Sequence, residues 1–168
     1  MPVPFRPRFW FLSLALVCAS LVGFALYVQH VKFIDPCPLC VFQRLAFLWI
    51  GAWSLLAALH NPSGPGRWAY GLVVEAGALA GLAVAGRHLW LQSLPADQVP
   101  DCGMGLNYML ETMPFTEVLT QVLYGSGECA EIDWTFLGLS MPGWTFLWYL
   151  LFAAGTIVVL IKAKSARV

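Results

Sequence analysis

Residues 33–49 read FIDPCPLCVFQRLAFLW and join a polar segment to an apolar one. Within this stretch Cys37 and Cys40 form a C-x-x-C pair, with a proline on each side of Cys37. Arg44 follows Cys40 by four residues, and the chain beyond it is almost entirely apolar. Such a pair at the start of a hydrophobic segment is compatible with a zinc knuckle, with a redox couple or with an accidental pair that has no function. The rest of the chain has to distinguish these interpretations.

The composition indicates that the chain resides in a membrane. Of its 168 residues, 60% are hydrophobic and only 11% are charged, whereas soluble domains carry roughly 25% charged residues. A spanning helix needs about 20 mostly apolar residues. Four stretches qualify, residues 9–28, 41–59, 68–89 and 144–161. We therefore expect one integral membrane domain over residues 1–168, an all-α bundle of four transmembrane helices.

The charged residues predict how these helices are oriented. Basic residues lie before the first stretch, between the second and third, and after the fourth: Arg6, Arg8, Arg67, Lys162, Lys164 and Arg167. By the positive-inside rule these ends, including both termini, belong in the cytoplasm. All acidic residues except Glu75 fall in the opposite, outer loops at about 29–40 and 90–143. The nine basic and nine acidic residues cancel, which argues against a nucleic-acid partner.

Four of the five cysteines fall in the two outer loops: Cys37, Cys40, Cys102 and Cys129, with Cys18 inside the first apolar stretch. The outer side of a bacterial inner membrane, the periplasm, is oxidising, so we expect two disulfides there. Four cysteines allow three pairings, and spacing alone does not choose among them.

The spacing does separate the chemical interpretations of the C-x-x-C pair. A zinc site is disfavoured because Cys102 and Cys129 are too widely spaced to form a second knuckle. Two purely structural disulfides are the alternative interpretation, but a structural disulfide stabilises a protein mainly by closing a long loop. A disulfide between Cys37 and Cys40 would close only a very short loop. The redox interpretation is therefore favoured for this pair, and we expect no metal.

Two neighbouring residues add to the redox interpretation. Proline suits the first position of a helix, so the second helix is expected to begin at Pro38, with Cys37 as its cap and Cys40 in its first turn. The partial positive charge of a helix N-terminus favours a thiolate. Arg44 lies one turn further on the same face. There it either extends to a lipid phosphate or stabilises an anion formed beside Cys40.

A C-x-x-C pair in this setting is expected to be strongly oxidising. Stabilising the reduced, thiolate form raises the reduction potential of a disulfide. The electrons that such a pair accepts need a further acceptor. At the membrane face, away from water, we expect that acceptor to be a lipid-soluble quinone.

The second outer loop contains an amphipathic segment, PFTEVLTQVLY, at residues 114–124. Its apolar residues recur at helical spacing: Phe115, Val118, Leu119, Val122 and Leu123. This pattern predicts a short interfacial helix, lying flat on the outer membrane interface. The helix is either a plain packing element or a device that keeps the disulfide loop near the membrane.

Aromatic and histidine side chains mark the ends of the third and fourth stretches. Trp134, Trp144 and Trp148 are expected in the aromatic belt at the membrane interface. His88 closes the third stretch, and we favour a role as partner of the helix dipole. The alternative is that His88 shares an acceptor pocket with Arg44, whose predicted depth is the same.

Several segments resemble the DsbB family, the inner-membrane quinone reductases that drive disulfide formation in the bacterial periplasm. The segments are QHVKFIDPCPLCVFQR, RHLWLQSLP, DCGM and GSGECAEIDWTFLGLSMPGW. They cover both outer loops in the order that a four-helix plan requires. Together they are far more specific than a lone C-x-x-C.

The resemblance implies a role for each loop cysteine. Cys37 and Cys40 match the quinone-proximal pair of the family. Cys102 and Cys129 match its second disulfide, which oxidises a soluble partner. Cys102 would form the mixed disulfide with that partner, a DsbA-like oxidase of the thioredoxin fold.

The resemblance also associates Arg44 and His88 with a membrane quinone, ubiquinone or menaquinone. Some relatives carry an acidic residue in place of Gln43, so the charge balance beside Arg44 differs from theirs. Three alternatives stay open: a specialised paralogue with a dedicated partner, a mechanism like that of the vitamin K epoxide reductases, and a non-catalytic stapled membrane protein that binds quinone.

The lengths of the loops that the cysteines would close and the family resemblance together predict the disulfides of the resting protein. We expect Cys37 bonded to Cys40, Cys102 bonded to Cys129, and Cys18 free. Peptide mapping under non-reducing conditions measures this pairing directly. A major disulfide that contains Cys18 would contradict the prediction.

Overall fold

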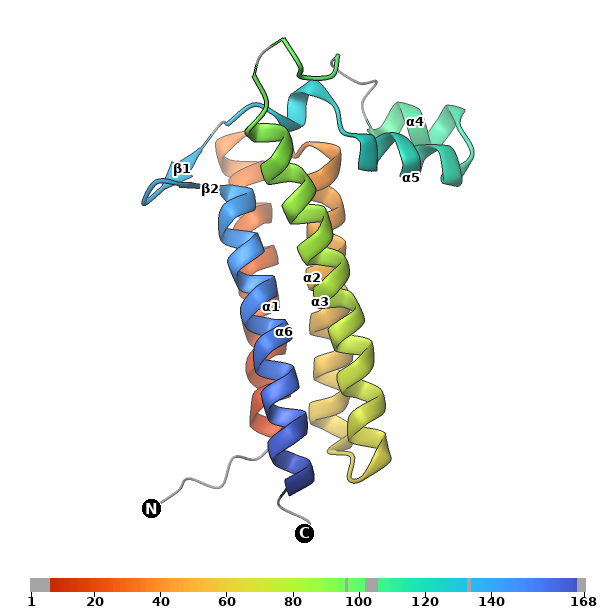
Figure 1. The fold of residues 1–168 in the computed structure, drawn as a ribbon, viewed down its shortest axis with the longest axis vertical. Coiled ribbons are helices and arrows are strands. Elements are labelled where there is room, and N and C mark those ends of the chain that lie inside the picture. Colours follow the sequence, from red (N-terminus) through yellow and green to blue (C-terminus); the bar gives the residue numbers. More distant parts are fainter. Residues whose placement is uncertain (1–6, 96, 102–105, 133, 166–168) are drawn as a thin grey trace.

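Four long helices form the body of the molecule in the computed structural model, which describes residues 7–95, 97–101, 106–132 and 134–165 (Figure 1). They are α1 (Pro7–Lys32), α2 (Pro38–His60), α3 (Pro65–Gln92) and α6 (Met141–Ser165). All four are long and apolar enough to cross a membrane, so the predicted all-α bundle of four membrane helices is confirmed. Three of the four begin at a proline, which lacks the N–H that would be unpaired at that position.

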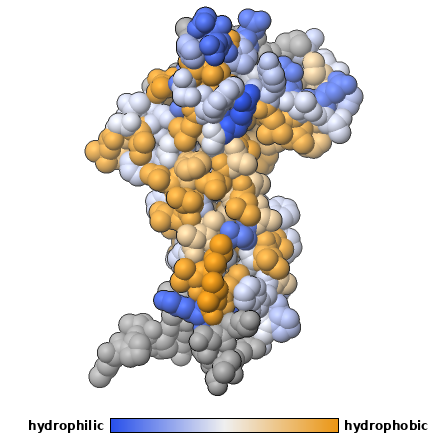
Figure 2. Space-filling model, viewed as in Figure 1, coloured by the Kyte–Doolittle hydropathy of each residue, from blue (hydrophilic) through white to orange (hydrophobic). Residues whose placement is uncertain are grey.

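The four helices form a ring in which α1 and α6 barely touch. α1 packs extensively on α2, α2 on α3 and α3 on α6, whereas α1 and α6 make few contacts. Large apolar side chains cover the outside of the bundle, with Leu16 and Leu72 each 61% exposed. Figure 2 shows this surface as an apolar band below a more hydrophilic end. A bilayer is the solvent that such a band requires.

Close contacts between an aromatic ring and a glycine hold the interior of the bundle. Tyr149 of α6 stacks on Phe47 of α2, with ring centroids 4.3 Å apart. The Tyr149 hydroxyl donates to the backbone carbonyl of Gln43 at 2.6 Å. Gly81 lets the same ring lie directly against α3. Helices in lipid associate through such packing and interhelical hydrogen bonds, because lipid is as apolar as the side chains.

The helices extend beyond the apolar stretches that predicted them. α2 begins at Pro38, as the prolines predicted, before the apolar stretch that starts at residue 41, and α3 continues past Leu89 to Gln92. Apolar residues mark only the part of a helix inside lipid, whereas the backbone hydrogen bonds continue into the interface. His88 therefore lies one turn inside α3, and the expectation that it closes the helix was wrong.

The segment between α3 and α6 lies across the end of the bundle opposite to the start of α1 and the end of α6 (Figure 1). Its elements are α4 (Leu106–Thr112), α5 (Phe115–Tyr124), the 3₁₀ turn η1 (Gly127–Cys129) and the hairpin strands β1 (Thr135–Phe136) and β2 (Leu139–Ser140). α5 is the predicted amphipathic helix, and its existence is confirmed. α4 and the two-residue strands are too short to produce a periodic pattern, so the sequence did not predict them.

A small second core joins this segment to the bundle. It consists of Leu39, Leu91, Met109, Val118, Val122 and Cys129. Phe115 and Leu123 of α5 remain exposed, so only part of the predicted apolar stripe enters this core. The location of α5 at the membrane interface stays a prediction.

The contact between Gly81 and Tyr149 predicts a position-specific loss of stability. A Cβ atom at Gly81 would overlap the Tyr149 ring, whereas one at Gly23 of α1 meets nothing within 4 Å. Gly81→Ala is therefore expected to lower the free energy of unfolding by about 1–3 kcal/mol. Thermal unfolding in detergent, followed by circular dichroism, measures the difference. Gly23→Ala is the matched control, and equal midpoints for the two variants would contradict the packing argument.

Candidate active site

The C-x-x-C pair stands where α2 begins. Pro38 is at the helix start, Cys37 is the N-cap residue in an extended conformation, and Cys40 lies in the first turn. This placement confirms the expectation drawn from the two prolines. The Cys37 and Cys40 sulfurs are 3.2 Å apart and hydrogen-bonded, so both residues are thiols in this structure. Their disulfide stays a prediction, but the geometry brings the two sulfurs within reach of one another.

Cys129 of the second loop lies beside this pair. The sulfurs of Cys37 and Cys129 and a ring nitrogen of His88 all lie within 4.8 Å of one another. Cys129 is fully buried. The neighbouring Cys37 thiol, together with burial, raises the pKa of the Cys129 thiol above its usual range. A buried thiol of this kind needs a base before it can attack a disulfide, because the thiolate is the nucleophile.

Two cysteines and a histidine are also residue types that bind soft metal ions. Thiol exchange between Cys37 and Cys129 requires the same proximity of the two sulfurs. The geometry is compatible with both, and thiol exchange stays the interpretation that the sequence favours.

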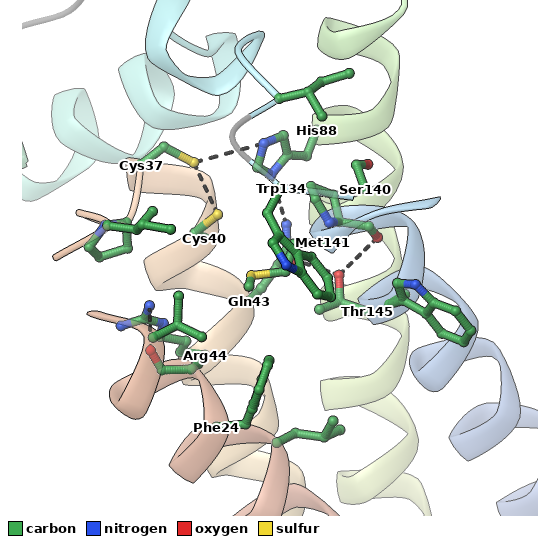
Figure 3. A pocket seen from close by; sticks show the side chains of 18 of the residues that line it. Phe24, Cys37, Cys40, Gln43, Arg44, His88, Trp134, Ser140, Met141 and Thr145 are labelled. Atoms are coloured by element: carbon green, nitrogen blue, oxygen red, sulfur yellow. Dashed lines mark hydrogen bonds between the residues drawn. The ribbon is translucent and has the colours of Figure 1, made fainter. Parts of the chain in front are cut away.

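His88 belongs to a chain of buried polar side chains that crosses from α3 to α2 and α6 (Figure 3). Its Nε2 atom faces the Cys37 sulfur at 3.8 Å, and its Nδ1 atom lies 3.1 Å from the Gln43 amide. The other end of that amide is 2.6 Å from the Thr145 hydroxyl. His88 and Gln43 are 2% and 3% exposed, so the hydrogen bond between these two side chains is shielded from water. His88 is thus part of the site, and the favoured role as a dipole partner at a helix end was wrong.

Arg44 is held by α1 rather than by the cysteines. Its guanidinium donates to the Gln29 side chain and to the backbone carbonyl of Ala25, the latter at 3.3 Å. The side chain is half-buried. It lines the same cavity as Cys40, which favours the anion-stabilising interpretation over a contact with a lipid phosphate.

A cavity of about 830 Å³ opens below the pair, between α1, α2, α6 and the hairpin. The groups that can form hydrogen bonds at its end nearest the loops include Cys37, Cys40, Gln43, Arg44 and His88. Apolar and aromatic side chains form most of the remaining wall, including Phe24, Phe47, Trp134, Trp144 and Trp148. The three tryptophans predicted in an aromatic belt thus line this cavity. A second, apolar hollow of about 500 Å³ follows the seam between α1 and α6, and Trp148 lines both.

Cys102 lies outside the described residues, but its neighbour Asp101 does not. The backbone N–H of Gly127 donates to the Asp101 carbonyl at 3.2 Å. This bond joins the residue before Cys102 to the turn that contains Cys129. The pairing of Cys102 with Cys129 stays a prediction, and the contact between the two segments supports it.

Gln43 and Thr145 are members of the site that sequence analysis did not select. The signal was weak: each is a polar residue near the end of an apolar stretch, and a glutamine or threonine there is most often a local packing feature. An ionisable residue within a membrane span is a candidate functional residue because its charge is costly there. The same criterion does not select an uncharged polar residue. Only the tertiary structure places both beside His88.

Comparison with known proteins assigns the family. The model of the family "DsbB: Disulfide bond formation protein DsbB" matches residues 7–159. A protein of Hahella chejuensis named "Disulfide bond formation protein B" is 54% identical over 154 residues, which cover 92% of this chain and 93% of the relative. Proteins of the same name from Marinobacter nauticus and Acinetobacter baumannii are 52% and 53% identical, and cover 94% and 81% of this chain and 95% and 81% of the relatives.

The match extends over all four membrane helices and both cysteine-bearing loops. With the resemblance of the loop motifs and the arrangement of the helices, it leads to one conclusion. The chain belongs to the DsbB family of disulfide bond formation proteins.

Proposed function

We propose that this protein is a membrane thiol:quinone oxidoreductase that sustains disulfide bond formation. It reoxidises a DsbA-like dithiol oxidase of the periplasm and passes the electrons to a membrane quinone. One observation carries the proposal. The C-x-x-C pair lies between the buried Cys129 of the other loop and an apolar cavity that contains Arg44. The family name, disulfide bond formation protein, supports the same class of reaction.

Electrons enter through the second loop. A thiolate of the partner attacks Cys102, which breaks the Cys102–Cys129 bond and releases Cys129. Cys129 then attacks Cys37, because Cys37 is the member of the pair whose sulfur lies within 4.8 Å of the Cys129 sulfur in the cluster with His88. The Cys37–Cys40 bond breaks, and Cys40 leaves as a thiolate beside the cavity. The second partner thiol displaces Cys102, which re-forms its bond with Cys129 and frees Cys37.

The cavity has features that fit a quinone. A bound quinone supplies an acceptor for two electrons and two protons. The Arg44 guanidinium has five N–H donors, and α1 engages two of its nitrogens, so donors remain for a ligand carbonyl. His88 lies at the same end of the cavity. The apolar hollow along the α1–α6 seam gives an isoprenoid tail a path toward lipid.

The proposal places the four loop cysteines on the periplasmic side of the bacterial inner membrane and both termini in the cytoplasm. Arg8, Arg67 and Lys162 support this orientation, because they lie at helix ends opposite to the cysteines. Basic residues concentrate on the cytoplasmic side of membrane proteins. The cysteines then face the oxidising compartment, where a thioredoxin-fold partner needs them.

Measuring the two half-reactions separately on Arg44→Gln tests the proposed function. The variant should show a raised KM for quinone and turnover slower by roughly 100-fold, because a positive charge beside the developing anions is lost in a partly dry site. Arg44→Lys should recover part of the rate, since lysine lacks the planar fork of donors. Exchange between the second disulfide and reduced partner should be unchanged.

Arg87→Gln is the matched control for this experiment. Arg87 is also a cation of the outer half of the bundle, but it donates to the carbonyls of Leu123 and Tyr124 and stacks on Trp90, outside the cavity lining. In the separate quinone half-reaction, from the reduced Cys37–Cys40 pair to quinone, its kinetics should be close to those of the wild type, because that step does not involve Cys129. Normal quinone kinetics in Arg44→Gln would remove the physical reason for placing the acceptor beside Cys40. A wild-type protein that fails to oxidise the partner would overturn the function itself.

Partner capture tests the order of attack in the second loop. Cys102→Ala should abolish the mixed disulfide with the thioredoxin-fold partner. A partner that lacks its own second cysteine should accumulate the mixed disulfide with the wild-type protein, because the thiol that displaces Cys102 is absent. Non-reducing gel electrophoresis after acid quenching measures both outcomes. A covalent complex formed through Cys129 in the Cys102→Ala protein would show that the assigned order is wrong.

A further inference from the structure

The inference concerns the β1–β2 hairpin, whose tip projects from the side of the bundle. The two strands pair in antiparallel register, which leaves Leu137 and Gly138 as a two-residue turn between them. Both turn residues have positive φ, 50° and 80°, as a type I′ turn requires. A Cβ atom at Gly138 would meet nothing within 4 Å. The tip of the turn therefore lies clear of the rest of the described protein.

Leucine is an unusual residue at the first position of this turn. A type I′ turn favours asparagine, aspartate or glycine there, because positive φ brings the Cβ atom of other residues too close to the backbone. The side chain of Leu137 is also 78% exposed, so packing within the described protein does not offset this cost. A strained residue without a compensating contact in its own chain points to a contact with another molecule.

The neighbours of Leu137 are apolar as well. Trp134, Phe136 and Leu139 are also exposed, and no charged residue occurs from Trp134 to Ile161. The hairpin and most of α6 are thus one uncharged segment of the chain. Figure 2 shows apolar residues on the side projection that the hairpin forms in Figure 1. A contiguous exposed apolar surface of this kind marks a site of contact with a protein or a membrane.

The position of the hairpin beside α6 determines its depth in the membrane. The apolar part of α6, Met141–Lys162, has 22 residues, which makes it about 33 Å long. The hydrocarbon core of a bilayer is about 30 Å thick, so its outer boundary falls near Met141. β2 ends directly before that residue, and the hairpin extends sideways from the bundle (Figure 1). The hairpin therefore lies where lipid headgroups meet acyl chains.

Two hydrogen bonds hold the base of the hairpin at this depth. The Nε1 atom of Trp144 donates to the backbone carbonyl of Phe136 at 3.0 Å. The Ser140 hydroxyl donates to the side chain of Gln92 at 2.7 Å. The Phe136 ring also packs on the Trp144 ring, with centroids 6.0 Å apart. The base is thus attached to α3 and α6, whereas the tip is left to contact another molecule.

We propose that the tip of the hairpin inserts into the outer leaflet of the bilayer and anchors this end of the molecule. The side chains of Phe136 and Leu137 contact the upper part of the acyl chains. The backbone of the hairpin stays among the headgroups, because lipid cannot satisfy the N–H and C=O groups at the edges of a two-stranded sheet.

A soluble protein is the competing occupant of an exposed apolar tip. Three observations favour lipid: the hairpin carries no charge, its apolar surface continues the band that faces the bilayer, and its tip extends sideways from the bundle. A tip made for a periplasmic partner would instead extend beyond the end of the bundle, as the segment 97–101 does (Figure 1).

Depth-dependent quenching tests the proposal on the full chain in vesicles of phosphatidylcholine and phosphatidylglycerol. A fluorescent unnatural amino acid replaces Leu137, Leu16 of the apolar band, or Gln98 of the segment 97–101, each in a separate protein. At position 137, lipids spin-labelled near the headgroup end of the acyl chain should quench more strongly than lipids labelled near the chain terminus. At position 16 the order should be reversed. Aqueous iodide should quench the fluorophore at position 98 most.

A charge at the tip gives a second measurement. With the fluorophore in place of Leu139, Leu137→Asp should weaken quenching by the labelled lipids and strengthen quenching by iodide, because a carboxylate is costly to remove from water. Leu137→Met is the matched control, since it keeps an apolar side chain, and it should leave both kinds of quenching unchanged. Circular dichroism checks that every variant retains the helix content of the wild type.

Strong iodide quenching at position 137, without quenching by either labelled lipid, would overturn the proposal. If addition of a thioredoxin-fold protein then removed the iodide quenching, the tip would belong to a partner interface instead. Equal quenching in folded Leu137→Asp and Leu137→Met proteins would also count against insertion. None of these measurements needs a quinone or electron transfer, so their outcome is independent of the proposed function.

Discussion

The start of α2 is the constraint on which the rest of the site depends. Pro38 cannot donate a backbone hydrogen bond, so it is suited to the first position of the helix and not to its interior. Cys37 is consequently the cap residue, outside the helix, and Cys40 lies in the first turn. One sulfur is thereby directed to Cys129, while the other lies beside the cavity with Arg44. A shift of the helix start by one residue would rotate Cys40 away from the cavity by about 100°.

The second loop is held against this helix end by two kinds of interaction. Leu39, which directly precedes Cys40 on the helix, packs with Leu91, Val118 and Val122. Arg87 donates to the last carbonyls of α5, where a helix C-terminus favours a cation. Gly125 has a positive φ of 89° and lies against Leu91, where a larger residue would clash. These contacts bring η1, and with it Cys129, over the start of α2.

α1 and α6 pack less closely than the other neighbouring pairs of membrane helices. The other helix pairs pack closely, but an apolar hollow follows this seam, and Trp148 lines both this hollow and the cavity. Polar groups are confined to one end of the cavity, where Gln43, Arg44 and His88 meet the cysteines. The C-x-x-C pair therefore lies between the buried Cys129 of the second loop and the cavity.

The sequence alone determined the number of membrane helices, because a span of about 20 apolar residues predicts a helix that crosses the bilayer. It also determined that Cys37 caps α2, since proline chemistry is local. The same holds for the existence of α5, whose apolar residues recur at the helical period. The motifs of both loops carry the family resemblance by themselves, because they are read directly from the order of residues. All of these properties depend on neighbours in the chain.

Only the tertiary structure decided what meets across the bundle. His88 lies on α3, Gln43 on α2 and Thr145 on α6, and no periodicity relates residues that far apart in the chain. The sequence placed His88 at a helix end because apolar composition stops at the membrane boundary, whereas the hydrogen-bonded backbone of α3 continues to Gln92. The proximity of Cys129 to Cys37 likewise follows from the second core and the Arg87 contacts. Long-range contacts are set by packing geometry, which a single chain's local pattern does not encode.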